Sequence, residues 1–160
     1  MDVEKLLRLL KENKVRFVII GATAFPVYGY SRSTLDIDIF IEDKLHNAEK
    51  VRRVMSEFGY DVSDITVEDL LTKKVLVREY TVQADFHPFV EGATFDEVWA
   101  RKVKAKLGDT FVWFASLDDL IKMKKAAGRA KDIEDLKYLL KLKRKWPIPS
   151  RHIRRKKTRQ

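Results

Sequence analysis

The length and the composition of the chain set the first limits on its structure and function. A chain of 160 residues fits one domain that is large enough to bury a hydrophobic core. The absence of cysteine excludes a disulfide scaffold, a cysteine nucleophile and a cysteine-based zinc site. No apolar run approaches the roughly 20 residues of a membrane-spanning helix, and the charged N-terminus lacks the apolar segment of a signal peptide. We therefore expect a cytoplasmic protein without a membrane partner.

The net charge of +9 is concentrated at the C-terminus. From Lys143 onward the chain contains nine lysines and arginines and no acid, whereas the preceding residues hold equal numbers of acidic and basic side chains. We divide the chain into a folded domain over residues 1–146 and a basic tail over residues 147–160. The tail is expected either to contact a phosphate backbone, such as that of RNA, or to be a disordered segment that aids solubility.

The composition also indicates an organism that grows at high temperature. Charged residues make up 36% of the chain, whereas asparagine and glutamine occur only at Asn13, Asn47, Gln83 and Gln160. Many lysines, arginines and glutamates combined with few amides are typical of thermophile proteins. We therefore expect a heat-stable domain.

Apolar periodicity predicts alternating helices and strands. In chain order, we expect a helix over 3–10, a strand over 15–20, a short helix over 22–28, a strand over 35–41, helices over 48–58 and 67–71, strands over 75–80 and 82–90, a short helix over 95–99, a hairpin of strands over 103–107 and 111–114, a helix starting near Leu117, and a helix over 132–145. This order predicts an α/β fold, in which a small mixed, largely antiparallel sheet is flanked by helices.

The strand over residues 35–41 carries two acidic residues on one face. Leu35, Ile37, Ile39 and Ile41 alternate with Asp36, Asp38 and Phe40. Residues two apart on a strand project from the same face, roughly 7 Å apart, so both carboxylates are able to reach one metal cluster. Hard divalent ions such as Mg²⁺ prefer such oxygen ligands and also bind substrate phosphates. The alternative is a half-exposed strand whose acids simply face solvent.

The segment before these acids favours the metal site. Ile20-Gly21-Ala22 follows an apolar strand, and a spacer of 13 residues separates it from Asp36-Ile37-Asp38. This pattern resembles the DNA polymerase beta nucleotidyltransferase superfamily. The resemblance implies a nucleotidyltransferase fold in which Gly21 and its neighbours approach a nucleotide triphosphate. Ala22 departs from the glycine or serine that is usual there, and Thr23 is the nearest hydroxyl that would replace it.

The same resemblance implies a third carboxylate on a later strand, and Asp85 in the alternating segment 82–90 is our candidate. Asp36, Asp38 and Asp85 would then be both the catalytic residues and the ligands of Mg²⁺, with Mn²⁺ as the alternative ion. His87 would share the face of Asp85, although a lone histidine is more often structural.

A narrower resemblance extends toward the C-terminus. Residues 120–139 are similar to a segment of small prokaryotic nucleotidyltransferase-like proteins related to abortive-infection toxins, and Lys124, Arg129, Lys131 and Asp132 match its charged positions. This resemblance implies C-terminal helices beside the active cleft. Cations there would stabilise charge on the leaving pyrophosphate, and we expect Lys124 and Arg32 to bind the nucleotide. The alternative is a pair of charged helices that face solvent.

The predicted function is the Mg²⁺-dependent transfer of a nucleoside monophosphate from a nucleoside triphosphate to an acceptor hydroxyl. The basic tail favours RNA, such as tRNA, as the acceptor. Two alternatives stay open at this point: a catalytically weak or inactive nucleotide-binding or regulatory module, which Ala22 would allow, and a toxin–antitoxin component that acts on a protein. The sequence does not select the nucleotide or the oligomeric state.

The tail hypothesis predicts a change in RNA binding when the chain is truncated after Trp146. Each phosphate contact with a single strand contributes about −0.7 to the slope of log K against log salt. If roughly three to six tail residues contact phosphates, truncation should weaken tRNA binding and flatten this slope by roughly two to four units. Filter binding across a salt series measures both quantities. Identical slopes for the full and truncated chains would contradict a role of the tail in RNA binding.

Overall fold

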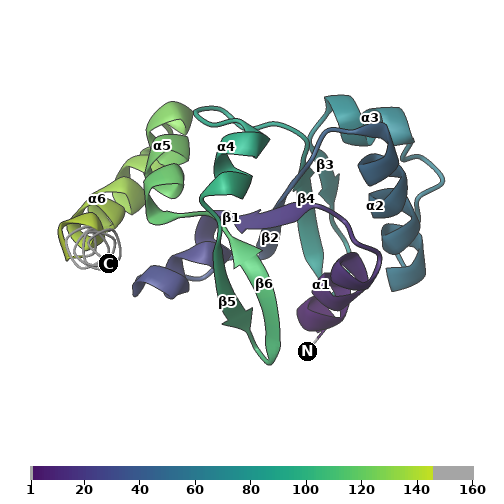
Figure 1. The fold of residues 1–160 in the computed structure, drawn as a ribbon, viewed down its shortest axis with the longest axis horizontal. Helices are drawn as coiled ribbons and strands as arrows, with labels where there is room; N and C mark the ends of the chain where they lie inside the picture. The colour runs from purple at the N-terminus through teal and green to yellow at the C-terminus, as the bar shows by residue number, and fades with distance from the viewer. Residues whose placement is uncertain (1, 146–160) are drawn as a thin grey trace, which may run out of the picture.

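The computed structural model describes residues 2–145 (Figure 1). The predicted basic tail, residues 147–160, lies outside the described residues. The elements in chain order are α1 (Asp2–Glu12), β1 (Phe17–Ile20), the 3₁₀ helix η1 (Gly21–Tyr28), β2 (Asp36–Ile41), α2 (Leu45–Phe58), α3 (Val67–Thr72), β3 (Val75–Val77), β4 (Gln83–His87), α4 (Phe95–Ala100), β5 (Val103–Leu107), β6 (Thr110–Phe114), α5 (Leu117–Ala127) and α6 (Ala130–Lys145).

One six-stranded mixed sheet forms the centre of the molecule, and its strand order is β3-β4-β2-β1-β6-β5. The pairs β1–β2, β3–β4 and β5–β6 are antiparallel, whereas β1–β6 and β2–β4 are parallel. The predicted α/β fold with a mixed, largely antiparallel sheet is therefore confirmed.

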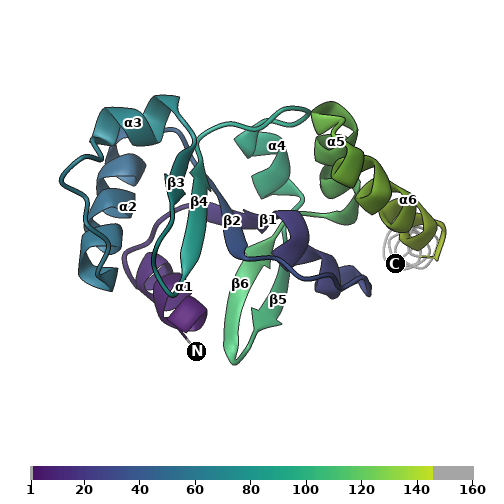
Figure 2. The ribbon, with the colours of Figure 1, turned by 180° about the vertical axis from the view of Figure 1, so that it is seen from behind.

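Helices flank the sheet in two groups. Figure 1 shows α2 and α3 at one end of the sheet and α5 and α6 at the other, and Figure 2 shows the same arrangement from behind. α1 packs on α2 and on β6, and α4 contacts β1. Among residues 2–145, no helix is long and apolar enough to cross a membrane.

The central strands are buried because their neighbours cover both faces. All four residues of β1 are buried, which agrees with the continuous apolar run in the sequence. In β2 the predicted alternation holds only for the first residues. Phe40, predicted on the acidic face, is buried against the ring of Phe95 at 5.2 Å. Leu35, predicted on the apolar face, lies before the strand and is 89% exposed.

Several helices and strands differ in type or length from the sequence prediction. The helix expected over 22–28 is the 3₁₀ helix η1, which contains Pro26. The two long strands expected over 75–80 and 82–90 are the short strands β3 and β4. The helix near Leu117 does begin after Ser116, whose hydroxyl accepts a hydrogen bond from the amide of Asp119. The Asp119 carboxylate accepts hydrogen bonds from the Arg101 guanidinium.

Candidate active site

Three carboxylates meet where β2 and β4 pair in parallel. Asp38 lies opposite Asp85 in the register, and Asp36, two residues before Asp38, projects from the same face of β2. Asp85 is only 3% exposed, while Asp36 and Asp38 are half-buried. The structure thus brings together the three acidic residues that the sequence selected.

Gly21 lies directly against this acidic cluster. It adopts a left-handed conformation with φ of +68°, which glycine reaches without strain. A Cβ atom at this position would overlap the Asp38 carboxylate oxygen Oδ2. The absence of a side chain therefore lets the backbone at the start of η1 approach Asp38.

His87 completes a group of atoms that suits a cation. Its Nε2 lies 2.8 Å from Oδ1 of Asp38. One ligand atom each from Asp38, Asp85 and His87 lie within 4.8 Å of one another. Carboxylate oxygens suit Mg²⁺ and Mn²⁺, whereas imidazole is a more usual ligand of zinc and later transition metals. With Mg²⁺, the chemistry of this group favours His87 as a hydrogen-bond partner that orients Asp38.

Two cations that flank β3, Lys74 before it and Arg78 after it, also contact the acids. The Arg78 guanidinium bridges two carboxylates, with Nη2 at 3.0 Å from Asp36 and at 3.2 Å from Asp85. Lys74 places its ammonium 3.9 Å from Asp85. The sequence analysis did not identify Arg78 or Lys74. Lys74 and Arg78 lie two residues on either side of Leu76, so the sequence could have placed all three on one face of a strand. Their relation to Asp85 follows only from the pairing of β3 with β4, in which Leu76 lies opposite Asp85.

A second set of cations comes from the segment after η1 (Arg32), from α5 (Lys124) and from the connection between α5 and α6 (Arg129). Asp135 of α6 is buried and accepts two hydrogen bonds from Arg32, at 2.7 and 2.9 Å. Asp132, one turn earlier, is also buried and accepts hydrogen bonds from Lys124 at 2.9 Å and from Arg129 at 2.7 Å. Sequence reasoning found Asp132 but missed Asp135.

The protonation of these buried acids follows from their partners. Burial by itself would raise the pKa of Asp132, but hydrogen bonds from Arg129 and Lys124 outweigh it and hold that pKa at about 2. Burial opposes ionisation of Asp135 as well, and the Arg32 and Lys124 cations lower its pKa below the usual value. Both carboxylates are therefore ionised at neutral pH and fix the three cations in place.

Two adjoining cavities define the cleft. The first, of about 320 Å³, has mainly apolar walls and is lined by Ile20, Gly21, Asp38, Lys74, His87, Phe89, Val90, Glu91, Leu120, Met123, Lys124, Ala127, Arg129 and Asp132. The second, of about 220 Å³, is polar and is lined by Ala22, Arg32, Thr34, Asp36, Asp38, Lys74, Arg78, Asp85, Lys124, Arg129 and Lys131. Asp38 and three of the cations border both cavities. An apolar chamber next to a charged one fits a ligand with an aromatic part and an anionic part.

The structure places most of the predicted nucleotide-binding residues around this cleft. Gly21, Ala22, Arg32 and Lys124 line one or both cavities. Thr23, proposed as a substitute for the missing hydroxyl at position 22, lines a neighbouring groove, which shares Thr34 and Asp36 with the polar cavity.

Comparisons with known proteins identify one family and one fold. The family model described as "Nucleotidyl transferase of unknown function (DUF2204)" matches residues 1–159. The chain also resembles a crystal structure described as "a putative nucleotidyltransferase" from Thermotoga maritima. The two share 19% sequence identity over 87% of this chain and 90% of that chain, with a TM-score of 0.56. At this identity the likeness concerns the fold. No curated protein shows a significant match.

The contact between Gly21 and Asp38 predicts that Gly21→Ala loses metal binding. The added methyl group would displace the Asp38 carboxylate, and the left-handed backbone would cost about 1 kcal/mol of stability in addition. Gly59→Ala is the matched control, because Gly59 also has a positive φ and a Cβ there meets no atom within 4 Å. Calorimetric titration with Mn²⁺ should show lost binding in the first variant alone. Equal binding by both would contradict the proposed crowding at Asp38.

Proposed function

The chain belongs to the nucleotidyl transferase family DUF2204, and from this premise we propose that it transfers a nucleoside monophosphate from a nucleoside triphosphate to an acceptor hydroxyl. The observation that carries the proposal is the meeting of Asp36, Asp38 and Asp85 with a set of fixed cations in one cleft. Acids that bind a divalent ion and cations that bind phosphates are the two requirements of this reaction.

Asp38 and Asp85 would hold a divalent ion, Mg²⁺ or Mn²⁺, while His87 keeps the Asp38 carboxylate in place. When bound, such an ion neutralises phosphate charge and activates the acceptor hydroxyl. Arg78 already neutralises part of the acidic charge, because it pairs with Asp36 and Asp85. Asp36, which pairs with Arg78, would complete the ion site beside Asp38.

The cleft also supplies a place for each part of the nucleotide. The triphosphate would lie in the polar cavity, where Arg32, Lys124 and Arg129 face it and the backbone at Gly21 approaches closely. These cations would stabilise the negative charge that develops on the leaving pyrophosphate. The base would occupy the apolar cavity, between Phe89 at its rim and Met123 of α5.

The chemical step follows from this placement. The acceptor oxygen would attack the α-phosphorus, forming a new phosphoester bond as the bond to pyrophosphate breaks. The Asp85 carboxylate would take the hydroxyl proton. Because the side chains are held by buried ion pairs and strand pairing, orientation of the reactants and charge neutralisation would supply most of the rate.

RNA is the acceptor that we propose, with the basic tail as its sequence-level support. A protein acceptor is the alternative, as expected of a toxin–antitoxin component. Incubation with each labelled nucleoside triphosphate, total RNA and a protein lysate, followed by gel analysis, separates the two, because the label enters nucleic acid or protein. Label in neither fraction would support the catalytically inactive, nucleotide-binding alternative that Ala22 allows.

The metal assignment predicts that Asp38→Asn and Asp36→Asn each abolish transfer and leave the fold intact. Both acids border a polar cavity, and removal of one reduces their mutual repulsion in the metal-free protein. Pyrophosphate release measures activity, and circular dichroism with a thermal melt tests the fold. Asp43→Asn is the matched control, because Asp43 is an exposed acid beyond the other end of β2. Full activity in either cleft variant would refute the assignment.

The pairing of Arg78 with the acids yields a separate prediction. Arg78→Ala should tighten Mn²⁺ binding, because an incoming ion no longer competes with the guanidinium. We expect a gain of about three- to fivefold, the size of a partly exposed ion pair. Arg78→Lys, which keeps the charge, should change the affinity less. Electron paramagnetic resonance of free Mn²⁺ gives both values, and weaker binding by Arg78→Ala would show instead that Arg78 supports the ion site.

A further inference from the structure

The outer hairpin of the sheet carries cations and aromatic rings on one exposed face. β5 and β6 pair so that Lys104 lies opposite Trp113 and Lys106 lies opposite Phe111. The ammonium of Lys102 lies over the ring of Trp113 at 4.5 Å, and those of Lys104 and Lys106 each lie 5.2 Å from the ring centre of Phe111. We call these five residues the hairpin surface.

In the described part of the chain, ion pairing explains none of the lysines of the hairpin surface, and packing against the body explains only its inner part, where half-buried Lys102 and Trp113 contact Trp99 of α4. Within residues 2–145, none of its three lysines forms an ion pair with a carboxylate. Lysines on an edge strand discourage aggregation, but they do not require an aromatic partner. Phe111 lies on β6, inside the sheet, and is still 42% exposed. A solvent-exposed aromatic ring beside lysines without carboxylate partners suits an anionic ligand that contains aromatic rings.

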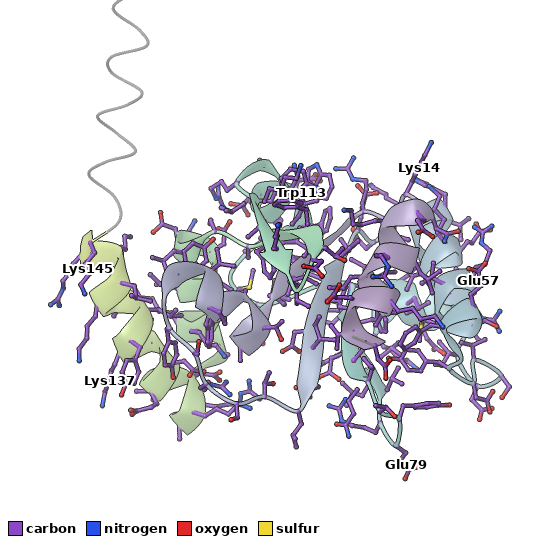
Figure 3. All side chains as sticks on the ribbon, turned by 90° about the horizontal axis from the view of Figure 1, so that it is seen from below. Lys14, Glu57, Glu79, Trp113, Lys137 and Lys145 are labelled. Atoms are coloured by element: carbon purple, nitrogen blue, oxygen red, sulfur yellow. The ribbon has the colours of Figure 1, made fainter. Side chains whose placement is uncertain are left out.

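The hairpin surface faces the same side of the sheet as the acids but lies outside the cleft. Phe114 pairs with Ile19, so its neighbour Trp113 projects to the face that Ile20 and Asp38 share. α4 stands between the two regions, with Trp99 packed on Trp113 at 6.4 Å. Three strand spacings, or roughly 14 Å, and about 70° of sheet twist also separate β2 from β5. Figure 3 shows Trp113 at the molecular surface, on the side away from Glu79.

We propose that the hairpin surface binds single-stranded RNA, with bases stacked on Phe111 and Trp113 and phosphates beside the three lysines. A docking site this far from the acids serves a polymer and not a small acceptor, since only a polymer reaches both places. The inference rests on the proposed function in taking RNA as the acceptor. It adds a binding surface that is independent of the basic tail.

The test measures how tightly a labelled oligouridine of about ten nucleotides binds to the full chain. Fluorescence anisotropy gives the affinity at each point of a salt series. Removing two phosphate contacts in the double variant Lys104→Ala/Lys106→Ala should reduce the salt slope by roughly 1.4 units. Phe111→Ala removes a stacking ring and no charge, so it should weaken binding by about fivefold or more and leave the slope unchanged. Circular dichroism confirms that each variant is folded.

The matched control is Lys5→Ala/Lys11→Ala, which removes the same charge from exposed positions on α1. α1 covers the opposite face, because Glu4 contacts Thr110, whose side chain alternates with that of Phe111. This control should keep the wild-type slope. Equal effects of the two double variants, or an unchanged slope in the hairpin variant, would overturn the proposal. Equally effective competition by polyglutamate would overturn it too, because the surface would then bind acidic polypeptide.

The outcome is separable from that of the proposed function. RNA binding is measured without nucleotide and without catalysis, so the two proposals have independent readouts. An active transferase whose hairpin variants bind RNA normally would refute only the hairpin surface. A wild-type chain that binds RNA through the hairpin but transfers no nucleotide would refute only the catalytic proposal.

Discussion

The parallel pairing of β2 with β4 is the constraint on which the rest of the cleft depends. It sets Asp38 directly opposite Asp85 and so concentrates negative charge on one patch of the sheet. Like charges at this separation destabilise the folded chain unless cations compensate them. Arg78 and Lys74 approach from β3, and the side-chain-free backbone of Gly21 gives Asp38 its room. Each of these features accommodates or compensates the carboxylates that this strand pair brings together.

In the second half of the cleft, the buried groups are acids and the groups that face the cavity are cations. Asp132 and Asp135 lie one turn apart on α6 and anchor Arg32, Lys124 and Arg129. A cation that is held by a buried carboxylate is oriented before the ligand arrives, so less side-chain entropy is lost on binding. The cleft thereby presents acids from the sheet and preoriented cations from the helices.

The sequence predicted those parts of this arrangement that are local. The sequence predicted the acidic face of the strand around Asp36 and Asp38 and the glycine after a buried strand. Both features depend only on residues that are close together in the chain. Asp85 was selected because the resemblance implies a third carboxylate on a later strand, and the alternating segment 82–90 offers that residue. Arg78 was missed because its role depends on the register between β3 and β4, which neither segment specifies alone. Asp135 was missed because an acid on a helix reads as solvent-facing until a partner such as Arg32, 103 positions away, is known.

In the proposed reaction the two halves of the cleft would share the binding of phosphate, and the departure at Ala22 bears on this division. Ala22 is almost fully buried, so the position demands a small side chain, and alanine meets that demand as serine or glycine would. Thr23 does not restore the lost hydroxyl, because it lines the neighbouring groove. The start of η1 still allows the backbone at Gly21 to approach the Asp38 carboxylate closely. In the proposed reaction, neutralisation of the phosphate charge would fall to Arg32, Lys124 and Arg129, because charged donors are stronger partners for a phosphate than a neutral hydroxyl.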